Sequence, residues 1–537
     1  MVNRVVDAVF AHRKGNVRRP VVLLAGHEPT PTEGRRYRND IPPHRWGFGQ
    51  AIGALHLGLT KEGVSAVSVN PYSGASYEYD NSRSDAGDME LSIKVPGKDV
   101  EVKLVAIAAR DELGLPTISI RKVSEPHYFA FDVYGNRTSE ISTKLTAPEG
   151  ECEGGIYKGG KMTEAMLVFN LALAQIAQKL NAAANAGERI IFHGNDHLTG
   201  LATFLVNGAG IPTAFTIHNP AYTTIADASV LASLQLSLPD RATRGGTADL
   251  LALAMIASKK LTTVSPTYAR EIGSTGFSYG PVRSYGDILG RRDVIGILNG
   301  LLPSKVAKSI EGPSGPVRVL MANRLDPQKG YDYLLNGLPA IQGVLSALGE
   351  QQLLDIRVIA DGDKKTQERL EALGKDRKMP LSYYPFSQER FEDGLKWAQI
   401  GLMPSMFEPC GLFAMTLQAQ GPLLLANEVG GLRDILGSAQ YWAAQEKEWE
   451  TVLGTRNLTA HNYGMAFGSV LNGDPARAIE ENNIFWNGLV ALARKLKTEP
   501  QLFMGMRMAA MERAQNEYTP QRVAQQYMAQ IYEKLMG

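Results

Sequence analysis

Short, largely apolar runs recur along this 537-residue chain, each followed by a polar turn and several by a segment of helical length. Runs with few polar interruptions are typical of strands buried on both faces, as in a parallel sheet that is covered by helices on each side. A helix-length segment at 163–184 lies between two of the runs. The first series of runs comprises residues 21–25, 64–69, 189–193, 213–217 and 260–264. The pattern predicts a doubly wound α/β domain.

A second series of such runs follows a stretch rich in Pro, Gly and Ser at 303–316, which is typical of a connection between domains. Its members are residues 317–322, 356–360, 400–404 and 422–426. We therefore predict two doubly wound, Rossmann-like domains, with ligands bound at the carboxyl ends of their strands. The predicted boundaries are 1–305 for the N-terminal domain, 306–517 for the C-terminal domain and 518–537 for a last helix.

Composition excludes several classes of protein. The formal net charge is +1, so there is no overall positive field for nucleic acid. No apolar run is long enough to cross a bilayer, and the first residues lack the apolar core of a secretory signal. The two cysteines, Cys152 and Cys410, are far apart in sequence, which argues against a disulfide framework or a cysteine-based metal site. These features predict a cytoplasmic protein without a membrane span, and the oligomeric state stays open.

Three segments of the second domain, 321–330, 407–412 and 427–434, resemble the donor site of a family of enzymes that use sugar nucleotides. A sugar nucleotide leaves as a diphosphate, so fixed cations such as Arg324 and Lys329 suit the phosphates. A carboxylate, Glu408, can hold sugar hydroxyls. Glycines allow backbone N–H groups to approach a ligand closely, and they stand at Gly411, Gly430 and Gly431.

In this order the segments resemble the donor site of the bacterial glycogen synthase and starch synthase family. Four further segments extend the resemblance: residues 193–200 resemble the family's His-x-His-Asp-Trp, and 215–222, 265–272 and 296–300 match other family segments. The resemblance implies a GT-B fold, with two Rossmann-like domains facing across a cleft. It also implies a hexosyltransferase that transfers glucose, with retention, from ADP-glucose or UDP-glucose to the nonreducing end of an α-1,4-glucan.

The resemblance also implies roles for individual residues. Arg324 and Lys329 would neutralise the diphosphate, and Glu408 would bind glucose hydroxyls. His218 would orient the glucose, and Asp196 would stand near the anomeric centre or the acceptor. The last helix would pack back on the N-terminal, acceptor-side domain. Further donor-binding positions are Gly47, Asn299, Phe386, Cys410, Gly411, Leu412, Gly430 and Gly431.

The same residues have structural alternatives. Asp196 could cap the helix that follows it, and Glu408 could be a carboxylate favoured by a helix N-terminus. Phe386 could be an ordinary core residue, and His218 a satisfied buried histidine. The segment Asp361–Asp363 resembles a metal-binding Asp-x-Asp but falls where the family has an ordinary turn. We therefore expect no metal and no cofactor, the nucleotide sugar being a substrate.

The N-terminal phosphate loop departs from the family pattern. Where the family has Lys-x-Gly-Gly, residues 44–47 read His-Arg-Trp-Gly, so the lysine is missing. One of the arginines in the longer preceding loop could substitute, because an arginine fork holds phosphate bidentately. These possible phosphate-loop cations are Arg35, Arg36, Arg38 and Arg45. The change leaves open a transferase with another acceptor, a sugar-nucleotide epimerase or a noncatalytic nucleotide-sugar-binding protein.

Overall fold

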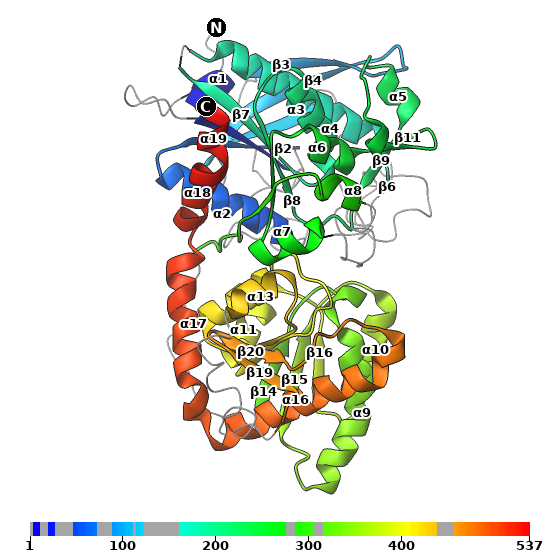
Figure 1. Cartoon of the computed structure of the whole chain (residues 1–537), viewed down its shortest axis with the longest axis vertical. Helices are drawn as coiled ribbons and strands as arrows, with labels where there is room; N and C mark the ends of the chain where they lie inside the picture. Colours follow the sequence, from blue (N-terminus) through cyan, green and yellow to red (C-terminus); the bar gives the residue numbers. More distant parts are fainter. Residues whose placement is uncertain are drawn as a thin grey trace. The chain divides into compact units, whose positions relative to one another are not determined.

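The computed structural model describes residues 4–10, 20–26, 47–71, 88–110, 114–122, 160–185, 187–274, 285–303, 315–437 and 455–537. The chain divides into two compact units. The first comprises residues 1–264, 269–302 and 520–537, and the second comprises 265–268 and 303–519. Both units are α/β, and their elements are labelled in Figure 1. In the described part of the chain, no helix combines the length and the apolar character that crossing a membrane requires.

The first unit is built on a nine-stranded sheet of order β13-β12-β8-β7-β1-β2-β5-β4-β3. It is parallel from β13 to β5, whereas β4 pairs antiparallel with both β5 and β3. Five of its parallel strands coincide with the first series of apolar runs. The strands are β1 (Pro20–Ala25), β2 (Ser65–Pro71), β3 (Met89–Lys94), β4 (Glu101–Arg110), β5 (Pro116–Lys122), β7 (Arg189–Asn195), β8 (Thr213–Ile217), β12 (Lys260–Thr263) and β13 (Val294–Gly296).

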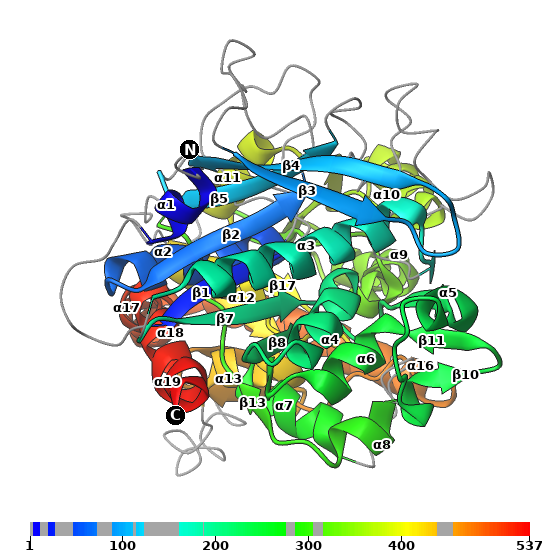
Figure 2. The same ribbon diagram turned by 90° about the horizontal axis from the view of Figure 1, so that it is seen from above.

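Helices cover both faces of this sheet, as the alternation along β1 shows. Val21 and Leu23 pack in a cluster with α1, α3 and α4, whereas Val22 and Leu24 pack in a cluster with α2 and the C-terminal helices. Figure 2 shows α3 lying along one face. The helices are α1 (Arg4–Phe10), α2 (Gly47–Lys61), α3 (Glu164–Ala183), α4 (Gly200–Gly208), α5 (Ala228–Ala232), α6 (Leu250–Ala257), α7 (Pro266–Gly273, shared with the second unit) and α8 (Gly286–Leu289).

Helix α3 shows how local sequence sets an element. Thr163 is its N-cap, and the Thr163 hydroxyl accepts a hydrogen bond from the Met166 amide at 3.2 Å. The helix ends at the cap residue Ala184, so the helix predicted over 163–184 is confirmed. A small four-stranded sheet lies in the same unit and consists of β6 (Gly160–Lys161), β9 (Thr224–Asp227), β10 (Thr243–Arg244) and β11 (Thr247–Asp249).

The C-terminal segment belongs to the first unit. It runs through α18 (Pro520–Tyr527), a π-helical turn at Met528–Tyr532 and α19 (Glu533–Met536). Helix α18 approaches α2 so closely that a Cβ on Gly58 would lie 1.9 Å from the Pro520 carbonyl oxygen. At the other end, the Arg189 guanidinium donates to the Met536 carbonyl at 3.0 Å.

The second unit has a seven-stranded sheet of order β16-β15-β14-β17-β18-β20-β19, in which only the last pair is antiparallel. Four strands coincide with the second series of apolar runs. The strands are β14 (Val317–Met321), β15 (Leu354–Ile359), β16 (Leu381–Tyr384), β17 (Ile400–Met403), β18 (Leu423–Ala426), β19 (Leu458–His461) and β20 (Gly464–Phe467).

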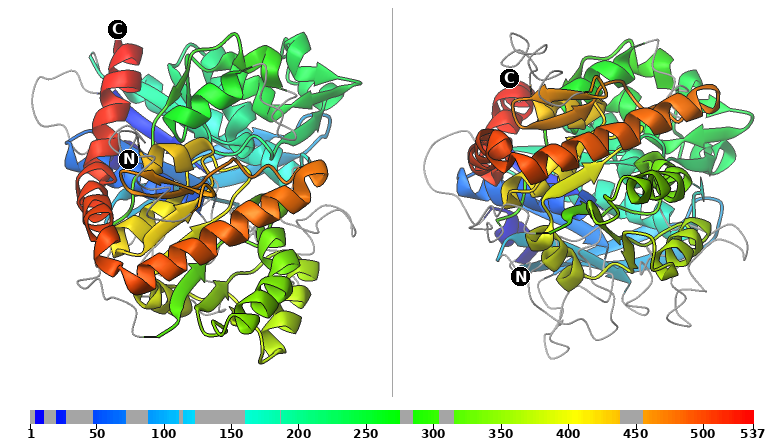
Figure 3. Two further views of the ribbon diagram at one scale, coloured as in Figure 1. Left: turned by 60° about the horizontal axis from the view of Figure 1, so that its bottom comes forward. Right: turned by 90° about the horizontal axis from the view of Figure 1, so that it is seen from below.

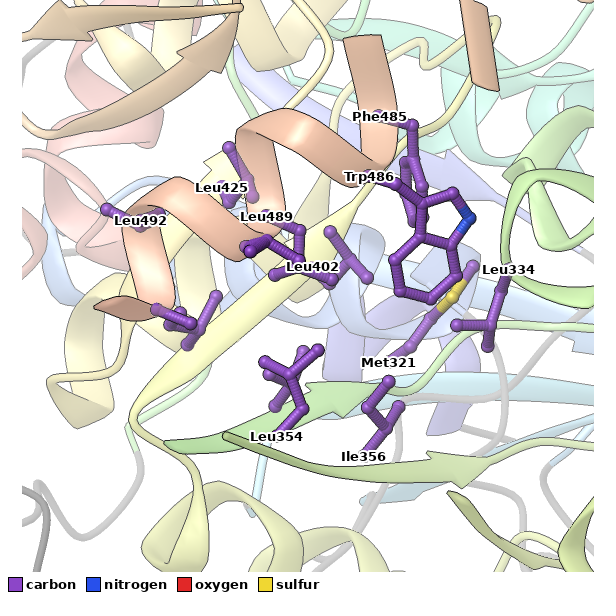
Figure 4. Close-up of a cluster of buried hydrophobic side chains, with 14 of the residues drawn as sticks. Met321, Leu334, Leu354, Ile356, Leu402, Leu425, Phe485, Trp486, Leu489 and Leu492 are labelled. Carbon is purple, nitrogen blue, oxygen red and sulfur yellow. The ribbon is translucent and has the colours of Figure 1, made fainter. Parts of the chain in front are cut away.

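Helix α16 (Ala478–Thr498) crosses this sheet, as Figure 3 shows. Its buried hydrophobic residues belong to the main core of the unit. Trp486 is buried in that core, and its indole N–H donates to the Tyr333 carbonyl at 3.0 Å. Figure 4 shows the apolar side chains around it, including Met321, Leu402 and Leu425 from the strands. The other helices are α9 (Tyr331–Ala347), α10 (Lys364–Lys375), α11 (Gln388–Trp397), α12 (Leu412–Gln420), α13 (Gly430–Leu436) and α17 (Met504–Glu517).

Candidate functional site

The candidate donor residues of the second unit lie beyond the carboxyl ends of its parallel strands. Lys329 follows β14, Glu408 follows β17, and Gly430 and Gly431 follow β18. β14 lies between β15 and β17, so the strand order reverses beside it. In open α/β sheets, ligands bind at such a reversal, outside the carboxyl ends of the strands.

Lys329 and Glu408 form a buried ion pair at this edge. The Lys329 ammonium lies 2.6 Å from Glu408 Oε2, and the two side chains are 10% and 9% exposed. The Ser405 hydroxyl donates to the same carboxylate oxygen at 3.2 Å. Glu408 is thus bonded to a lysine and a serine. Helix α12 begins only after its N-cap residue Gly411, so Glu408 lies outside the helix. The ion pair with Lys329 therefore gives Glu408 a partner other than a helix N-terminus.

Backbone contacts around Gln328 hold Lys329 in position. Lys329 ends a short 3-10 turn, Pro327–Lys329, whose N-cap Asp326 accepts from the Gln328 amide. The Gln328 side chain donates to the Phe407 carbonyl at 2.7 Å, and the Met406 amide donates to the Gln328 carbonyl at 2.9 Å. The turn after β14 is therefore fastened to the loop that carries Glu408.

The glycines of the motifs permit close backbone approach. Gly411 has φ +96°, a left-handed conformation that favours glycine. The Gly431 amide donates to the Glu408 carbonyl at 2.9 Å, and a Cβ on Gly431 would lie 2.0 Å from the Cys410 carbonyl oxygen. Cys410 is buried, and Leu412 is the first residue of α12. The structure thus gathers Lys329, Glu408, Cys410, Gly411 and Gly431.

We expect Gly431→Ala to destabilise the second unit, because the added methyl group would clash with backbone atoms of Cys410 and no side-chain rotation can relieve that clash. Overpacking of this kind costs about 1–3 kcal/mol or more in unfolding free energy. Gly343→Ala is the matched control, since Gly343 lies in α9 and a Cβ there meets nothing within 4 Å. Its helix propensity should raise stability by about 0.5–1 kcal/mol. Urea denaturation measures both, and a Gly431→Ala variant as stable as wild type would contradict the packing argument.

Asn427 is a buried residue of this site that the sequence analysis did not single out. Its side-chain amide donates to the Ser405 carbonyl at 3.0 Å and to the Leu471 carbonyl at 2.7 Å, and its oxygen accepts from the Leu471 amide at 3.0 Å. These bonds tie the loops after β17, β18 and β20 together. The sequence feature that could have identified Asn427 is an asparagine directly after a buried strand.

Phe386 and Asp361–Asp363 lie at the ends of β16 and β15. Phe386 is half-buried, and its ring centroid lies 5.8 Å from that of Phe391. The Asp361 carboxylate accepts from the Phe386 amide at 3.2 Å. The Asp363 carboxylate caps α10 by accepting from the Thr366 amide and hydroxyl at 2.8 Å each. Both carboxylates of the Asp-x-Asp segment therefore have structural partners. Within the described residues, no three His, Cys, Asp or Glu side chains gather as a metal site would require.

In the first unit, the structure brings Asp196 and His218 together at the ends of neighbouring strands β7 and β8. The Asp196 carboxylate accepts from the backbone amides of His218, at 2.9 Å, and Asn219, at 3.3 Å. It makes no side-chain cap on the 3-10 turn that follows, so the capping alternative is wrong. Asp196 has φ 56° and ψ 178°, a conformation that costs a non-glycine residue about 1–3 kcal/mol.

Burial shifts the ionisation of both residues toward the neutral form. Asp196 is 3% exposed. Desolvation raises its pKa to about 7, and the two amide hydrogen bonds oppose this rise. Desolvation, with a smaller effect from His193, lowers the pKa of His218 to about 3, although part of the residue reaches the surface. Near neutral pH the imidazole of His218 is therefore neutral. Its Nε2 lies 3.0 Å from Asn195 Oδ1.

Three further predicted residues lie at a helix start or shortly after a strand. Gly47 begins α2, and Asn299 is buried in the segment after β13. Arg324, in the second unit, is half-buried between β14 and the turn that carries Lys329. The possible phosphate-loop cations Arg35, Arg36, Arg38 and Arg45 lie outside the described residues.

Comparison with known proteins gives sequence and structural relatives. Residues 47–282 match the family model of the starch synthase catalytic domain. A glycogen synthase from Desulfitobacterium hafniense is 34% identical over 250 residues, which cover 42% of this chain and 50% of the relative. One from Anaeromyxobacter sp. is 30% identical over 323 residues, covering 50% of this chain and 64% of the relative. The match to these relatives thus spans between half and two thirds of their length.

A solved structure is similar over nearly the whole chain. The catalytic domain of starch synthase IV from Arabidopsis thaliana, bound to ADP and acarbose, superposes with a TM-score of 0.65 at 19% identity. The match covers 96% of this chain and 99% of the other. At this identity the likeness concerns the fold, and the predicted GT-B fold class is confirmed.

Proposed function

We infer that this chain, a divergent member of the glycogen and starch synthase family, is a retaining glycosyltransferase that builds α-1,4-glucan. The donor is ADP-glucose or UDP-glucose, and the acceptor is the nonreducing end of the glucan. The observation that carries this proposal is the buried pair of Lys329 and Glu408 at the strand-order reversal of the second unit. A fixed cation and a fixed carboxylate side by side suit a ligand that has phosphates at one end and hydroxyls at the other.

Lys329 can bind a diphosphate while it keeps its ion pair with Glu408. An ammonium group has three N–H donors, and the Glu408 bond uses one of them. A second can donate to a phosphate oxygen, where charge accumulates as the glycosidic bond breaks. Arg324, which lies between β14 and this turn, is the second cation of this proposal. A preorganised donor at developing negative charge lowers a barrier by about 3–4 kcal/mol.

Glu408 would accept hydrogen bonds from glucose hydroxyls with its remaining lone pairs, since a carboxylate has about four acceptor positions. The Asn427 side chain, which donates to the Ser405 carbonyl, and the Gly431 amide, which donates to the Glu408 carbonyl, hold the loop around it. Gly411, Leu412 and Gly430 would supply backbone groups near the donor, and Phe386 would lie against the base.

The first unit would position the sugar and the acceptor. Asp196 fixes the main chain of His218 through the amide hydrogen bond, and a neutral His218 can orient a hydroxyl. We assign no protein base to the reaction, because the departing phosphate can accept the proton of the attacking hydroxyl. Gly47 and Asn299 would contribute at the donor phosphates and sugar.

The test is to incubate the purified chain with ADP-glucose and UDP-glucose, with and without glycogen, and to measure nucleotide release. We expect release that depends on glycogen. It should persist in EDTA, because Arg324 and Lys329 supply the positive charge at the diphosphate. Interconversion of donor sugars without acceptor would instead indicate an epimerase. Binding without turnover would indicate a noncatalytic protein, and release only with a small glycoside would indicate another acceptor.

A further inference from the structure

Asn195, the last residue of β7, has its side-chain orientation fixed by two carbonyl groups. Its Nδ2 lies 3.1 Å from the Ala25 carbonyl oxygen, at the end of β1, and 3.2 Å from the His193 carbonyl oxygen. Carbonyl oxygens only accept hydrogen bonds, so the atom facing them has to be the nitrogen. Both amide protons are thereby used. Asn195 is buried, and β7 and β1 are neighbours where the strand order of this sheet reverses.

This orientation directs Asn195 Oδ1 toward the ring of His218. Oδ1 lies 3.0 Å from His218 Nε2. An amide oxygen cannot donate, so Nε2 has to carry the proton. A neutral imidazole with a proton on Nε2 has a lone pair on Nδ1. Burial lowers the pKa of His218 to about 3, so the doubly protonated form does not compete near neutral pH.

The last residue of β7 and the residue that follows it therefore hold His218 at two points. Asn195 holds the ring, and Asp196 holds the backbone amide at 2.9 Å. The loop after His218 is also fixed, because Asn219 Oδ1 accepts from the Ala221 amide at 3.1 Å. Asp196 has a positive φ of 56° in this arrangement, a backbone conformation that is costly for a residue other than glycine.

We propose that Asn195 is a positioning residue that locks His218 in the Nε2–H tautomer, so that His218 Nδ1 can only accept a hydrogen bond. A ligand group that meets Nδ1 has to be a donor, such as a sugar hydroxyl, and cannot be a phosphate or carboxylate oxygen. The choice of a sugar as ligand rests on the proposed function, whereas the tautomer does not.

The direct test is the tautomer of His218 in the intact chain labelled with [15N]histidine. The His218→Gln variant assigns the signals, and two-bond couplings to ring protons identify the protonated nitrogen. We expect Nε2–H in the wild type and a detectable share of Nδ1–H in Asn195→Ala. A wild-type ring protonated at Nδ1, or an Asn195→Ala spectrum identical to wild type, would overturn the proposal.

Asn170 provides the matched control, because it makes the same set of bonds away from His218. Its side-chain amide donates to the Met166 and Leu198 carbonyls, and its oxygen accepts from the Ala202 amide. Both residues are buried, so Asn170→Ala and Asn195→Ala should destabilise the chain to a similar extent. Only Asn195→Ala should change the His218 signals. An equal change in Asn170→Ala would show a general structural effect and contradict the proposal.

Turnover supplies a second, separate readout. Losing one hydrogen bond that orients a reacting group corresponds to a decrease in kcat of about tenfold. We expect that decrease in Asn195→Ala and a change within about twofold in Asn170→Ala. If the wild type transfers no sugar, the proposed function fails while the tautomer measurement still decides the role of Asn195. If Asn195→Ala does not fold, the wild-type spectrum alone decides it.

Discussion

Lys329→Ala is expected to reduce glucosyl transfer by about a hundredfold or more and to destabilise the second unit. The loss of rate corresponds to about 3 kcal/mol of charge stabilisation at the leaving diphosphate. The loss of stability has a different cause, because the substitution leaves the Glu408 carboxylate buried at 9% exposure without its cation. Removing one partner of a buried ion pair costs about 3–5 kcal/mol in unfolding free energy. Steady-state kinetics and urea denaturation measure the two effects.

The double variant Lys329→Ala with Glu408→Gln separates these effects. Neutralising the carboxylate removes the uncompensated charge, so stability should return toward that of the wild type while turnover stays low. Lys364→Ala is the control for loss of a lysine at an exposed pair, since Lys364 and Glu368 lie 4.0 Å apart with both side chains mostly exposed. Such pairs contribute less than about 1 kcal/mol. Near-normal turnover of Lys329→Ala on its donor would mean that the donor site lies elsewhere.

The sequence predicts nine of the parallel strands, five in the first unit and four in the second, because burial on both faces removes the need for polar residues. The antiparallel β3 is different, and the prediction from unbroken apolar runs missed it. Its residues alternate, with Met89, Leu91 and Ile93 buried between exposed neighbours. This period of two is typical of a strand with one covered face, so the signal was present but of another kind.

The candidate site was predictable where its residues are close in sequence and only partly where they are not. The segment around Glu408 and Gly411 carries recognisable chemistry by itself. That Lys329 binds Glu408 across 79 positions of sequence does not follow from the residue types, although both residues were predicted. Asn195 was missed for a related reason, because its partner Ala25 O is a backbone atom 170 positions away. Every residue has a backbone carbonyl, so the sequence does not show which of them will accept a hydrogen bond from Asn195.

Asp196→Asn is expected to make the first unit increasingly more stable than wild type as pH rises from about 4 to 7. Burial raises the pKa of Asp196 to about 7 in the folded chain, whereas an unfolded aspartate has a pKa of about 3.9. Between these values the folded state binds one proton more than the unfolded state, so wild-type stability falls as pH rises. Over about three pH units the loss is on the order of 4 kcal/mol. Asparagine has no such proton to lose, and near pH 4 it resembles the protonated acid.

The difference in unfolding free energy between variant and wild type isolates this effect from other titrating groups. Urea denaturation from pH 4 to 8, monitored by hydrogen exchange in β7 and β8, measures this difference for the first unit. Asp227→Asn is the control, because Asp227 is an exposed cap that accepts from the Ser229 amide at 2.9 Å and should give a difference that changes little over this range. A flat difference for Asp196→Asn would show that Asp196 ionises as easily in the folded chain as in the unfolded one. A rising difference would mean that the chain keeps, next to His218, a carboxyl group that costs stability at neutral pH, and such a cost is typical of residues retained for a site.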